Sequence, residues 1–328
     1  MAGLVNMTKP SMPPMADQRD QPNAASDAWT TQPERSNLAI LRLMVWISLR
    51  LGRPVGRLVL RGIALYFLAF SPTARRASGV YLQRALGRRP GFSDRYRHIL
   101  WFASTIHDRI YLLNERFDLF DIRIVGEEAI RQAIADGQGV LLFGAHMGSF
   151  EVMRAVGRRV AGLKVSMLMY DENARKINAT LAAINPAAVE DLIPLGRSDS
   201  MLQVKERLDA GHIVGVLADR GLRGDTASSL SFLGEPAPLP TGPFRLAALL
   251  RRPVLFMTGL YLGGNRYEAH FELLADFRDV ERHARTAAAH AAQARYMARL
   301  EYFCRQSPYN WFNFFDFWQT PVAEARGS

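Results

Sequence analysis

Residues 140–151, VLLFGAHMGSFE, bring together side chains that can do acid–base chemistry. A histidine can take a proton from a hydroxyl with one ring nitrogen while the other is hydrogen-bonded to a carboxylate. His146 and Glu151 are five positions apart, which inside one helix would leave their side chains roughly 140° apart. We therefore expect His146 on a turn after a buried strand, with Glu151 in the first turns of the next helix as the partner of the imidazole.

Two small residues within this motif fit a substrate site. Gly148 allows a substrate to approach the backbone closely, and the amides at the start of the helix can help to hold an oxyanion. Ser149 is expected to cap the helix. The structural alternative is a polar pair at a strand end, in which His146 and Glu151 have no catalytic role.

The motif resembles the H-x4-D/E motif of the lysophospholipid acyltransferase superfamily, and most closely its bacterial lipid A lauroyl/myristoyl acyltransferase branch. The resemblance covers roughly residues 120–318. The branch commonly has an arginine-bearing segment where this chain reads INPAAVEDLIPLG. That departure leaves open whether the acceptor is lipid A, another glycolipid, or a polyene or amino lipid.

Two later blocks continue the resemblance and supply further candidate substrate-binding residues. The candidates are Asp219, Arg220, Gly221, Thr241 and Gly242. The first three end a predicted strand. Asp219 or Arg220 is expected there to bind a phosphate or position a carbonyl, or alternatively the two only form a strand-end ion pair. The other two precede a helix after a proline-rich segment that is expected to wall a lipid pocket or, alternatively, to be a rigid connection. The expected apolar rim of that pocket is Phe232, Leu233, Leu239 and Phe244.

The last block is aromatic. Seven of the 12 residues in 307–318, SPYNWFNFFDFW, are aromatic, which is typical of a core plug or of an interfacial belt. Pro308 and Trp311 match a Pro-x-x-Trp segment found at this place in the branch. Cys304, the only cysteine, is expected to serve in packing, because a single cysteine excludes an internal disulfide and no His motif accompanies it.

The resemblance implies an O-acyltransferase at the cytoplasmic face of a bacterial inner membrane. The donor would be acyl carrier protein or acyl-CoA, the acceptor a lipid or glycolipid hydroxyl, and no metal or other cofactor is expected. Two rivals stay open. One is a thioester or ester hydrolase with Ser149 as nucleophile, although the G-x-S-x-G elbow is missing. The other is a peripheral membrane protein without catalytic activity.

The region before the motif carries the excess positive charge. Residues 36–116 contain 14 Arg and no Lys against three acidic residues, and the arginines interrupt every apolar run. Such amphipathic helices suit an anionic membrane surface, with guanidinium groups on lipid phosphates. The alternatives are core helices with a basic face, one unusual membrane span, or nucleic acid, which we do not expect because no binding motif accompanies the charge.

The remaining elements predict an α/β fold with a mixed central sheet flanked by helices. Residues 1–35 are expected to form a disordered leader, 36–116 the basic amphipathic helical region and 117–320 the acyltransferase domain. The predicted strands are 121–125, 140–143, 165–169, 213–217, 253–262 and 267–274, and the predicted helices are 127–135, one from about 149, 201–208 and 282–305. Since His146 and Asp219 each follow a strand, we expect them in one shared cleft.

Overall fold

The sheet and its flanking helices are resolved in a computed structural model, which describes residues 34–152, 156–157, 164–170, 184, 191–196, 199–221 and 225–318. The strands are β1 (Asp121–Val125), β2 (Val140–Gly144), β3 (Val165–Tyr170), β4 (Asp191–Leu195), β5 (Ile213–Leu217), β6 (Ala227–Phe232), β7 (Glu235–Pro240), β8 (Pro253–Tyr261) and β9 (Arg266–Asp276). The α-helices are α1 (Glu34–Phe70), α2 (Pro72–Leu86), α3 (Phe92–Leu113), α4 (Glu127–Ala133), α7 (Ser200–Asp209), α8 (Gly242–Leu250) and α9 (Arg285–Gln306). Short 3-10 helices are η1 (Phe117–Leu119) and η3 (Arg282–Ala284).

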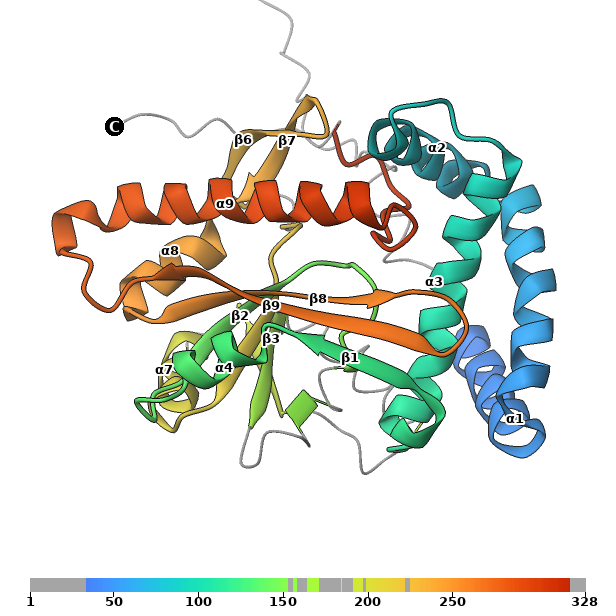
Figure 1. Ribbon diagram of the computed structural model, residues 1–328, viewed down its shortest axis with the longest axis horizontal. Coiled ribbons are helices and arrows are strands. Elements are labelled where there is room, and N and C mark those ends of the chain that lie inside the picture. Colours follow the sequence, from blue (N-terminus) through green and yellow to red (C-terminus); the bar gives the residue numbers. More distant parts are fainter. Residues whose placement is uncertain are drawn as a thin grey trace, which may run out of the picture.

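The predicted mixed α/β sheet is confirmed. Seven strands follow the order β1-β9-β8-β2-β5-β3-β4, and β6 and β7 form a separate hairpin (Figure 1). All pairs in the large sheet are parallel except β8 with β9. The neighbours β2 and β5 end together, with Gly144 opposite Leu217. Whatever follows these two strands must therefore emerge at one edge of the sheet.

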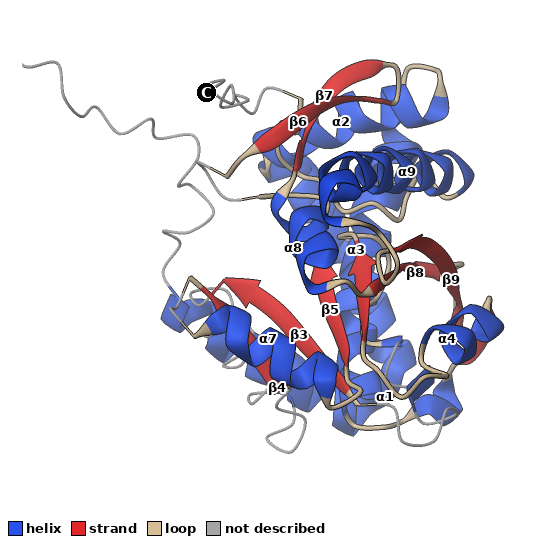
Figure 2. Ribbon diagram, turned by 90° about the vertical axis from the view of Figure 1, so that its left-hand side faces the viewer, coloured by secondary structure: helices blue, strands red, loops and turns tan. Residues whose placement is uncertain are grey.

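The central strands are buried on both faces, as their near-continuous apolar sequences predict. Leu141 and Phe143 of β2 belong to one core cluster, whereas Val140 and Leu142 belong to the other, as the alternation of side chains along a strand requires. Helices α8 and α9 lie over one face and α4 over the other (Figures 1 and 2). The motif strand is thus packed on both faces up to the turn that carries His146.

Sequence patterns found six of the seven strands of the large sheet and missed β4. Among the described strands, β4 pairs with β3 alone and is the edge of the sheet. It carries Pro194, which an edge strand tolerates because a missing N–H on its outer side costs no ladder hydrogen bond. The pairing of the proline-rich segment with β6 was also missed, although its extended form was expected. Its prolines occupy alternate positions of β7, so their missing N–H groups all lie along one side of the strand. Residues 1–33, most of the expected leader, and most of the helix expected from 149 lie outside the described residues.

The N-terminal helices are joined to the sheet by a buried ion cluster. Asp108 of α3 accepts two hydrogen bonds from Arg53, at 2.8 and 3.0 Å, and one from Arg57 at 2.5 Å. Tyr267 of β9 donates to the same carboxylate at 2.7 Å. The expectation that arginines of this region face lipid phosphate is therefore wrong for Arg53 and Arg57, because an internal carboxylate holds both.

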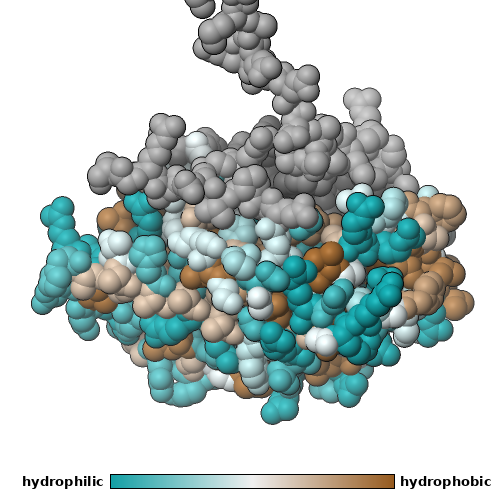
Figure 3. Space-filling view, turned by 90° about the horizontal axis from the view of Figure 1, so that it is seen from above, coloured by the Kyte–Doolittle hydropathy of each residue, from teal (hydrophilic) through white to brown (hydrophobic). Residues whose placement is uncertain are grey.

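The outer side of these helices exposes apolar residues. They are Trp46, Leu49, Leu51, Val55, Leu58, Val59, Leu65, Tyr66, Phe67 and Phe70 on α1, with Phe92, Phe102 and Ile106 on α3, and together they form what we call the apolar face. Figure 3 shows hydrophobic side chains gathered at the right-hand end of the molecule, where these helices lie in Figure 1. Within the described residues, no single helix has the length and composition to cross a membrane. The bent pair Val45–Phe70 and Pro72–Leu86, which meets at 94°, passes by length and composition together.

Candidate active site

His146 and Asp219 meet at the edge where β2 and β5 end. The imidazole Nδ1 lies 2.8 Å from Oδ1 of Asp219, and the His146 amide donates to Oδ2 at 3.2 Å. An ionised carboxylate only accepts hydrogen bonds, so Nδ1 carries the proton and Nε2 keeps its lone pair. The side chain of His146 is 39% exposed and that of Asp219 is 0% exposed. The expected proximity of the two strand ends is confirmed. The His146 imidazole is partly exposed to solvent and is hydrogen-bonded to the buried Asp219 carboxylate.

The surroundings of this pair favour a neutral imidazole on an ionised carboxylate. Burial lowers the pKa of His146, Arg220 lowers it further, and the opposing effect of Asp219 does not restore the ordinary value. Burial alone would raise the pKa of Asp219, but its interactions with His146 and Arg220 and its hydrogen bonds hold that pKa well below the usual range. A neutral imidazole is the state in which a histidine can act as general base.

Glu151 has other partners than the imidazole. Its Oε1 lies 2.5 Å from Nε of Arg109 on α3, and its Oε2 accepts a hydrogen bond of 3.0 Å from Ser149 Oγ. The predicted hydrogen bond between His146 and Glu151 is therefore wrong, and Asp219 is the partner of Nδ1. The spacing of five residues permitted a contact within the motif, but it carried no information about a carboxylate arriving from the neighbouring strand. Glu151 ties the motif loop to α3 instead.

The backbone of the motif loop is fastened to β8. Gly148 has a φ of +65°, and a Cβ on it would lie 1.8 Å from the carbonyl oxygen of Gly259. The Ser149 amide donates to that same oxygen at 2.8 Å, and the Gly148 amide donates to Asn310 O at 2.9 Å. The close approach that Gly148 permits is therefore that of a strand, not of a substrate. The amides of Gly148 and Ser149 already have acceptors, so neither is available to the oxyanion that was expected at the start of the helix.

The aromatic tail after α9 completes the site. Phe312 N donates to His146 O at 2.8 Å. The indole of Trp311, which is fully buried, donates from Nε1 to Asp219 Oδ2 at 3.0 Å. Of the two alternatives for this segment, Trp311 is a core plug. A buried indole needs an acceptor for its N–H, so the sequence signalled that Trp311 has one but could not say which.

His98 of α3 supports the tail from behind and was not singled out from the sequence. Its Nε2 lies 2.9 Å from Trp311 O, and its Nδ1 lies 2.8 Å from Ser78 Oγ. Because a carbonyl only accepts, Nε2 carries the proton and the Ser78 hydroxyl donates to Nδ1. Burial lowers the pKa of His98 to about 4, so the ring is neutral at neutral pH. A histidine within an amphipathic helix gives no sequence signal for such a contact.

The sequence profile of the bacterial lipid A biosynthesis acyltransferase family matches residues 99–320. The chain belongs to this family. It is accordingly an acyltransferase, with an acyl donor and a lipid acceptor implied at the level of the family. No curated protein matches the chain. The matched range starts within α3 and includes the motif loop, the Asp219 strand end and the aromatic tail.

Arg220 of this lipid A-type acyltransferase lies beside His146 and Asp219, which we call the dyad. Its Nε is 3.5 Å from Asp219 Oδ2, its Nη2 donates to Phe312 O at 3.2 Å, and its guanidinium lies over the ring of Phe315 at 4.8 Å. Burial lowers the pKa of Arg220, and the Asp219 carboxylate opposes that effect. The strand-end ion pair is thus present, and the side chain, 25% exposed, keeps part of its surface open beside His146.

The remaining candidates belong to the hairpin and α8. Thr241 Oγ1 donates to Thr226 O at 3.1 Å, and Gly242 begins α8. Gly221, after β5, lies against the entry to the hairpin: a Cβ on it would be 2.7 Å from the Asp225 side chain and 3.3 Å from Pro240. Within the described part of the chain, no hydrogen bond joins Thr241 or Gly242 to the dyad. The four rim residues are buried in the core cluster. The predicted lipid pocket along that rim is therefore wrong, because the apolar side chains pack against the sheet, α9 and the tail.

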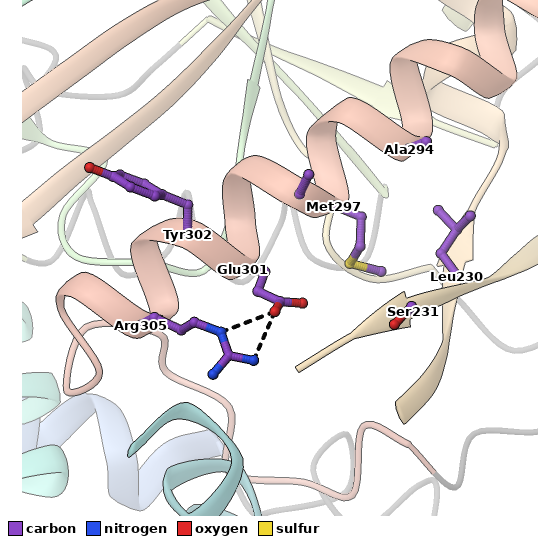
Figure 4. A pocket seen from close by; sticks show the side chains of 8 residues that line it. Leu230, Ser231, Ala294, Met297, Glu301, Tyr302 and Arg305 are labelled. Carbon is purple, nitrogen blue, oxygen red and sulfur yellow. Dashed lines mark hydrogen bonds and ion pairs between the residues drawn. The ribbon is translucent and has the colours of Figure 1, made fainter. Parts of the chain in front are cut away.

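An open groove of about 570 Å³ instead lies between β6 of the hairpin and α9. Figure 4 shows Leu230 and Ser231 on one side and Met297, Glu301 and Arg305 on the other. Glu301 accepts hydrogen bonds from Arg305 at 2.9 and 3.0 Å, so these charges already neutralise each other. None of the candidate site residues lines this groove. Across the described residues, no group of three or more His, Cys, Asp or Glu could hold a metal ion.

Proposed function

We propose that this family member moves a fatty acyl group from an acyl thioester to a hydroxyl of a lipid or glycolipid, with His146 as general base and Asp219 as its orienting partner. The observation that carries the proposal is the 2.8 Å contact between Nδ1 and a fully buried carboxylate, with the ring itself partly exposed. Asp219 fixes the tautomer, so that Nε2 presents a lone pair to a hydroxyl.

The chemical step is a direct transfer. Nε2 takes the hydroxyl proton as the acceptor oxygen attacks the thioester carbonyl, and the C–S bond then breaks as the tetrahedral intermediate collapses. The proton leaves with the thiol, and Asp219 stabilises the imidazolium between the two events. Acyl carrier protein or acyl-CoA fits as the donor, and an acidic carrier suits a chain with a formal net charge of +10.

The position of the partly exposed His146 imidazole supports action at a membrane surface. Phe102 of α3 contacts Phe312 and Phe314 of the tail, at ring distances of 5.2 Å each. Phe102 also belongs to the apolar face, which continues along α1. The backbone of His146 is hydrogen-bonded to Phe312. The dyad therefore lies close to the apolar face, on which a lipid acceptor would arrive. We place this surface on the cytoplasmic side of the bacterial inner membrane, where acyl thioesters are made.

The burial and hydrogen bonding of Ser149 favour the transferase over the hydrolase alternative. Ser149 is 1% exposed, and its hydroxyl donates to Glu151. A serine in this state neither meets a substrate nor gives its proton to His146. Replacing Ser149 by Ala should therefore leave most of the activity, and an acyl-Ser149 intermediate should not be trapped.

The test is transfer by purified protein from acyl carrier protein or acyl-CoA to extracted lipids, followed by mass spectrometry. His146→Ala should lower the rate by about 10²–10⁴-fold because the general base is lost. His283→Ala is the matched control, since its side chain is 81% exposed on η3. Thioester cleavage should be slow without acceptor and rise when acceptor is added. Full transfer by His146→Ala, or cleavage indifferent to acceptor, would contradict the proposal.

A further inference from the structure

A second cavity lies in the N-terminal helices, at the corner where α1 bends into α2. Its volume is about 210 Å³, and its lining residues are Leu65, Leu68, Ala69, Arg75, Phe92 and Arg95. Two arginines and four apolar or small residues therefore share one space, and no acidic residue is among them. Nothing in the proposed acyl transfer uses this corner.

Among the described residues, nothing pairs with the guanidinium of Arg95. Its side chain makes no hydrogen bond or ion pair within the described part of the chain, and its Nε is buried without an acceptor. The group lies against Gly79 of α2, where an added Cβ would be 3.2 Å from Nη2 and 3.3 Å from Nε. The glycine thus makes room for the guanidinium. A buried N–H without an acceptor is unfavourable, and an anion in the cavity would relieve the charge of this group.

Arg75 reaches the same cavity from α2 in a fixed orientation. Its Nη1 donates to Leu68 O at 3.0 Å and to Ala69 O at 3.1 Å, which are carbonyls at the end of α1. These bonds use one terminal nitrogen and leave Nε and Nη2 as donors. Two guanidinium groups with spare donors match the oxygens of a phosphate, which arginine recognises through paired hydrogen bonds.

The rim of the cavity selects an amphiphile over a free anion. Phe92 and Leu65, which line the cavity, are 66% and 51% exposed. A phosphate ion would leave these side chains in water, whereas a lipid would cover them with its chain. The charge and the apolar rim together describe a ligand with an anionic head and an alkyl tail.

We propose that this corner binds one anionic phospholipid, with its phosphate on Arg75 and Arg95 and its acyl chain against Leu65, Leu68 and Phe92. The inference rests on the proposed membrane-facing position of the N-terminal helices and is independent of the dyad. Lipid retention can therefore fail while transfer activity survives, and the reverse also holds.

The experiment is native mass spectrometry of the whole protein in detergent, with phosphatidylglycerol or phosphatidylcholine added. The wild type should retain one phosphatidylglycerol and little phosphatidylcholine. Arg95→Gln should lower that retention about tenfold or more, and Arg75→Gln should also lower it. Arg76→Gln is the matched control. It removes the same charge as Arg75→Gln from the same helix, α2, at an exposed residue that does not line the cavity.

Three outcomes would overturn the proposal. Equal retention by Arg95→Gln and the wild type would remove the site, and equal retention of both lipids would remove the anionic preference. Displacement of the lipid by millimolar inorganic phosphate or glycerol phosphate would show that a free phosphate, rather than a lipid, is the ligand. Because Arg75 also binds the end of α1, thermal melts of both variants should accompany the measurement. A loss of retention by a variant that melts like the wild type supports the site.

Discussion

At the scale of single residues, the central question is which carboxylate accepts the hydrogen bond from Nδ1 of His146. Asp219 is buried and accepts from His146 and Trp311, whereas Glu151 is engaged by Arg109 and Ser149. The motif histidine and the motif acid are thus assigned to separate tasks. His146 is the base in the proposed reaction, whereas Glu151 links the motif loop to α3 through Arg109.

This division predicts different effects for the two amide substitutions. Asp219→Asn should reduce kcat by at least about 100-fold, because a neutral amide neither fixes the Nδ1–H tautomer nor stabilises the imidazolium. Glu151→Gln should keep more activity and instead lower the free energy of unfolding by about 1–3 kcal/mol, through the weakened contact with Arg109. Paired kinetics and denaturant melts measure both. A larger kinetic loss in Glu151→Gln at unchanged stability would return the orienting role to Glu151.

The pH dependence follows from the lowered pKa of His146. Only the neutral ring accepts a proton, so kcat/KM rises with pH through that pKa. Since burial and Arg220 hold the pKa below the ordinary value of about 6.5, the acidic limb of the profile should lie below that pH. Arg220→Gln removes one lowering influence and should move the limb to higher pH. Arg245→Gln, an exposed residue of α8, should leave it in place. An unmoved limb in Arg220→Gln would separate Arg220 from the base.

At the scale of elements, the aromatic tail contributes hydrogen bonds to the site as well as packing. Residues after α9 bond to the motif loop, and Trp311 lies between Tyr81 of α2 and Phe232 of β6, at ring distances of 4.9 and 5.2 Å. The same indole donates to the Asp219 carboxylate. Packing of three distant elements is thereby linked to the orientation of one side chain.

Trp311→Phe separates the packing from the hydrogen bond. The phenyl ring keeps much of the contact with Tyr81 and Phe232, but Asp219 loses one donor. A hydrogen bond to a charged group contributes about 1.5–3 kcal/mol, so kcat should fall by roughly 10- to 100-fold. Trp318→Phe is the control, since its Nε1 bonds only weakly to Phe232 O at 3.4 Å. Comparable kinetics in both variants would show that the tail acts by packing alone.

Sequence reasoning reached the elements better than the contacts between them. Buried strands such as β2 and β5 are recognisable from their apolar runs. Since ligands gather at the carboxyl ends of strands, the sequence predicted that His146 and Asp219 share one cleft. The predicted hydrogen bond between His146 and Glu151 was wrong because residue spacing describes only local geometry. The actual partner, Asp219, is 73 positions away in the sequence. The apolar rim at Phe232 was assigned to a pocket because composition does not tell a core side chain from a ligand contact.

At the scale of the whole molecule, charge and apolar surface are arranged on one end. The arginines of the N-terminal helices divide into internal and external sets, since Arg53 and Arg57 bind Asp108 while others such as Arg50 and Arg61 stay exposed. Beside the exposed set lies the apolar face of α1 and α3. A lipid surface suits both, because guanidinium groups reach phosphates while apolar side chains enter the acyl boundary.

The apolar face therefore predicts how the molecule meets its substrate. Leu58→Gln, at a side chain that is 65% exposed on α1, should weaken binding to anionic vesicles by about tenfold, because burial of a leucine is worth roughly 1.5–3 kcal/mol. Leu273→Gln, at a residue 57% exposed on β9, is the matched control and should bind normally. Transfer to vesicle-borne acceptor should fall in Leu58→Gln while transfer to detergent-dispersed acceptor stays unchanged, since the dyad is intact. Vesicle sedimentation with and without salt measures the binding, which should weaken as salt screens the arginines. Full retention of Leu58→Gln on vesicles, even after alkaline washing, would instead favour a membrane-inserted α1–α2 pair over surface binding.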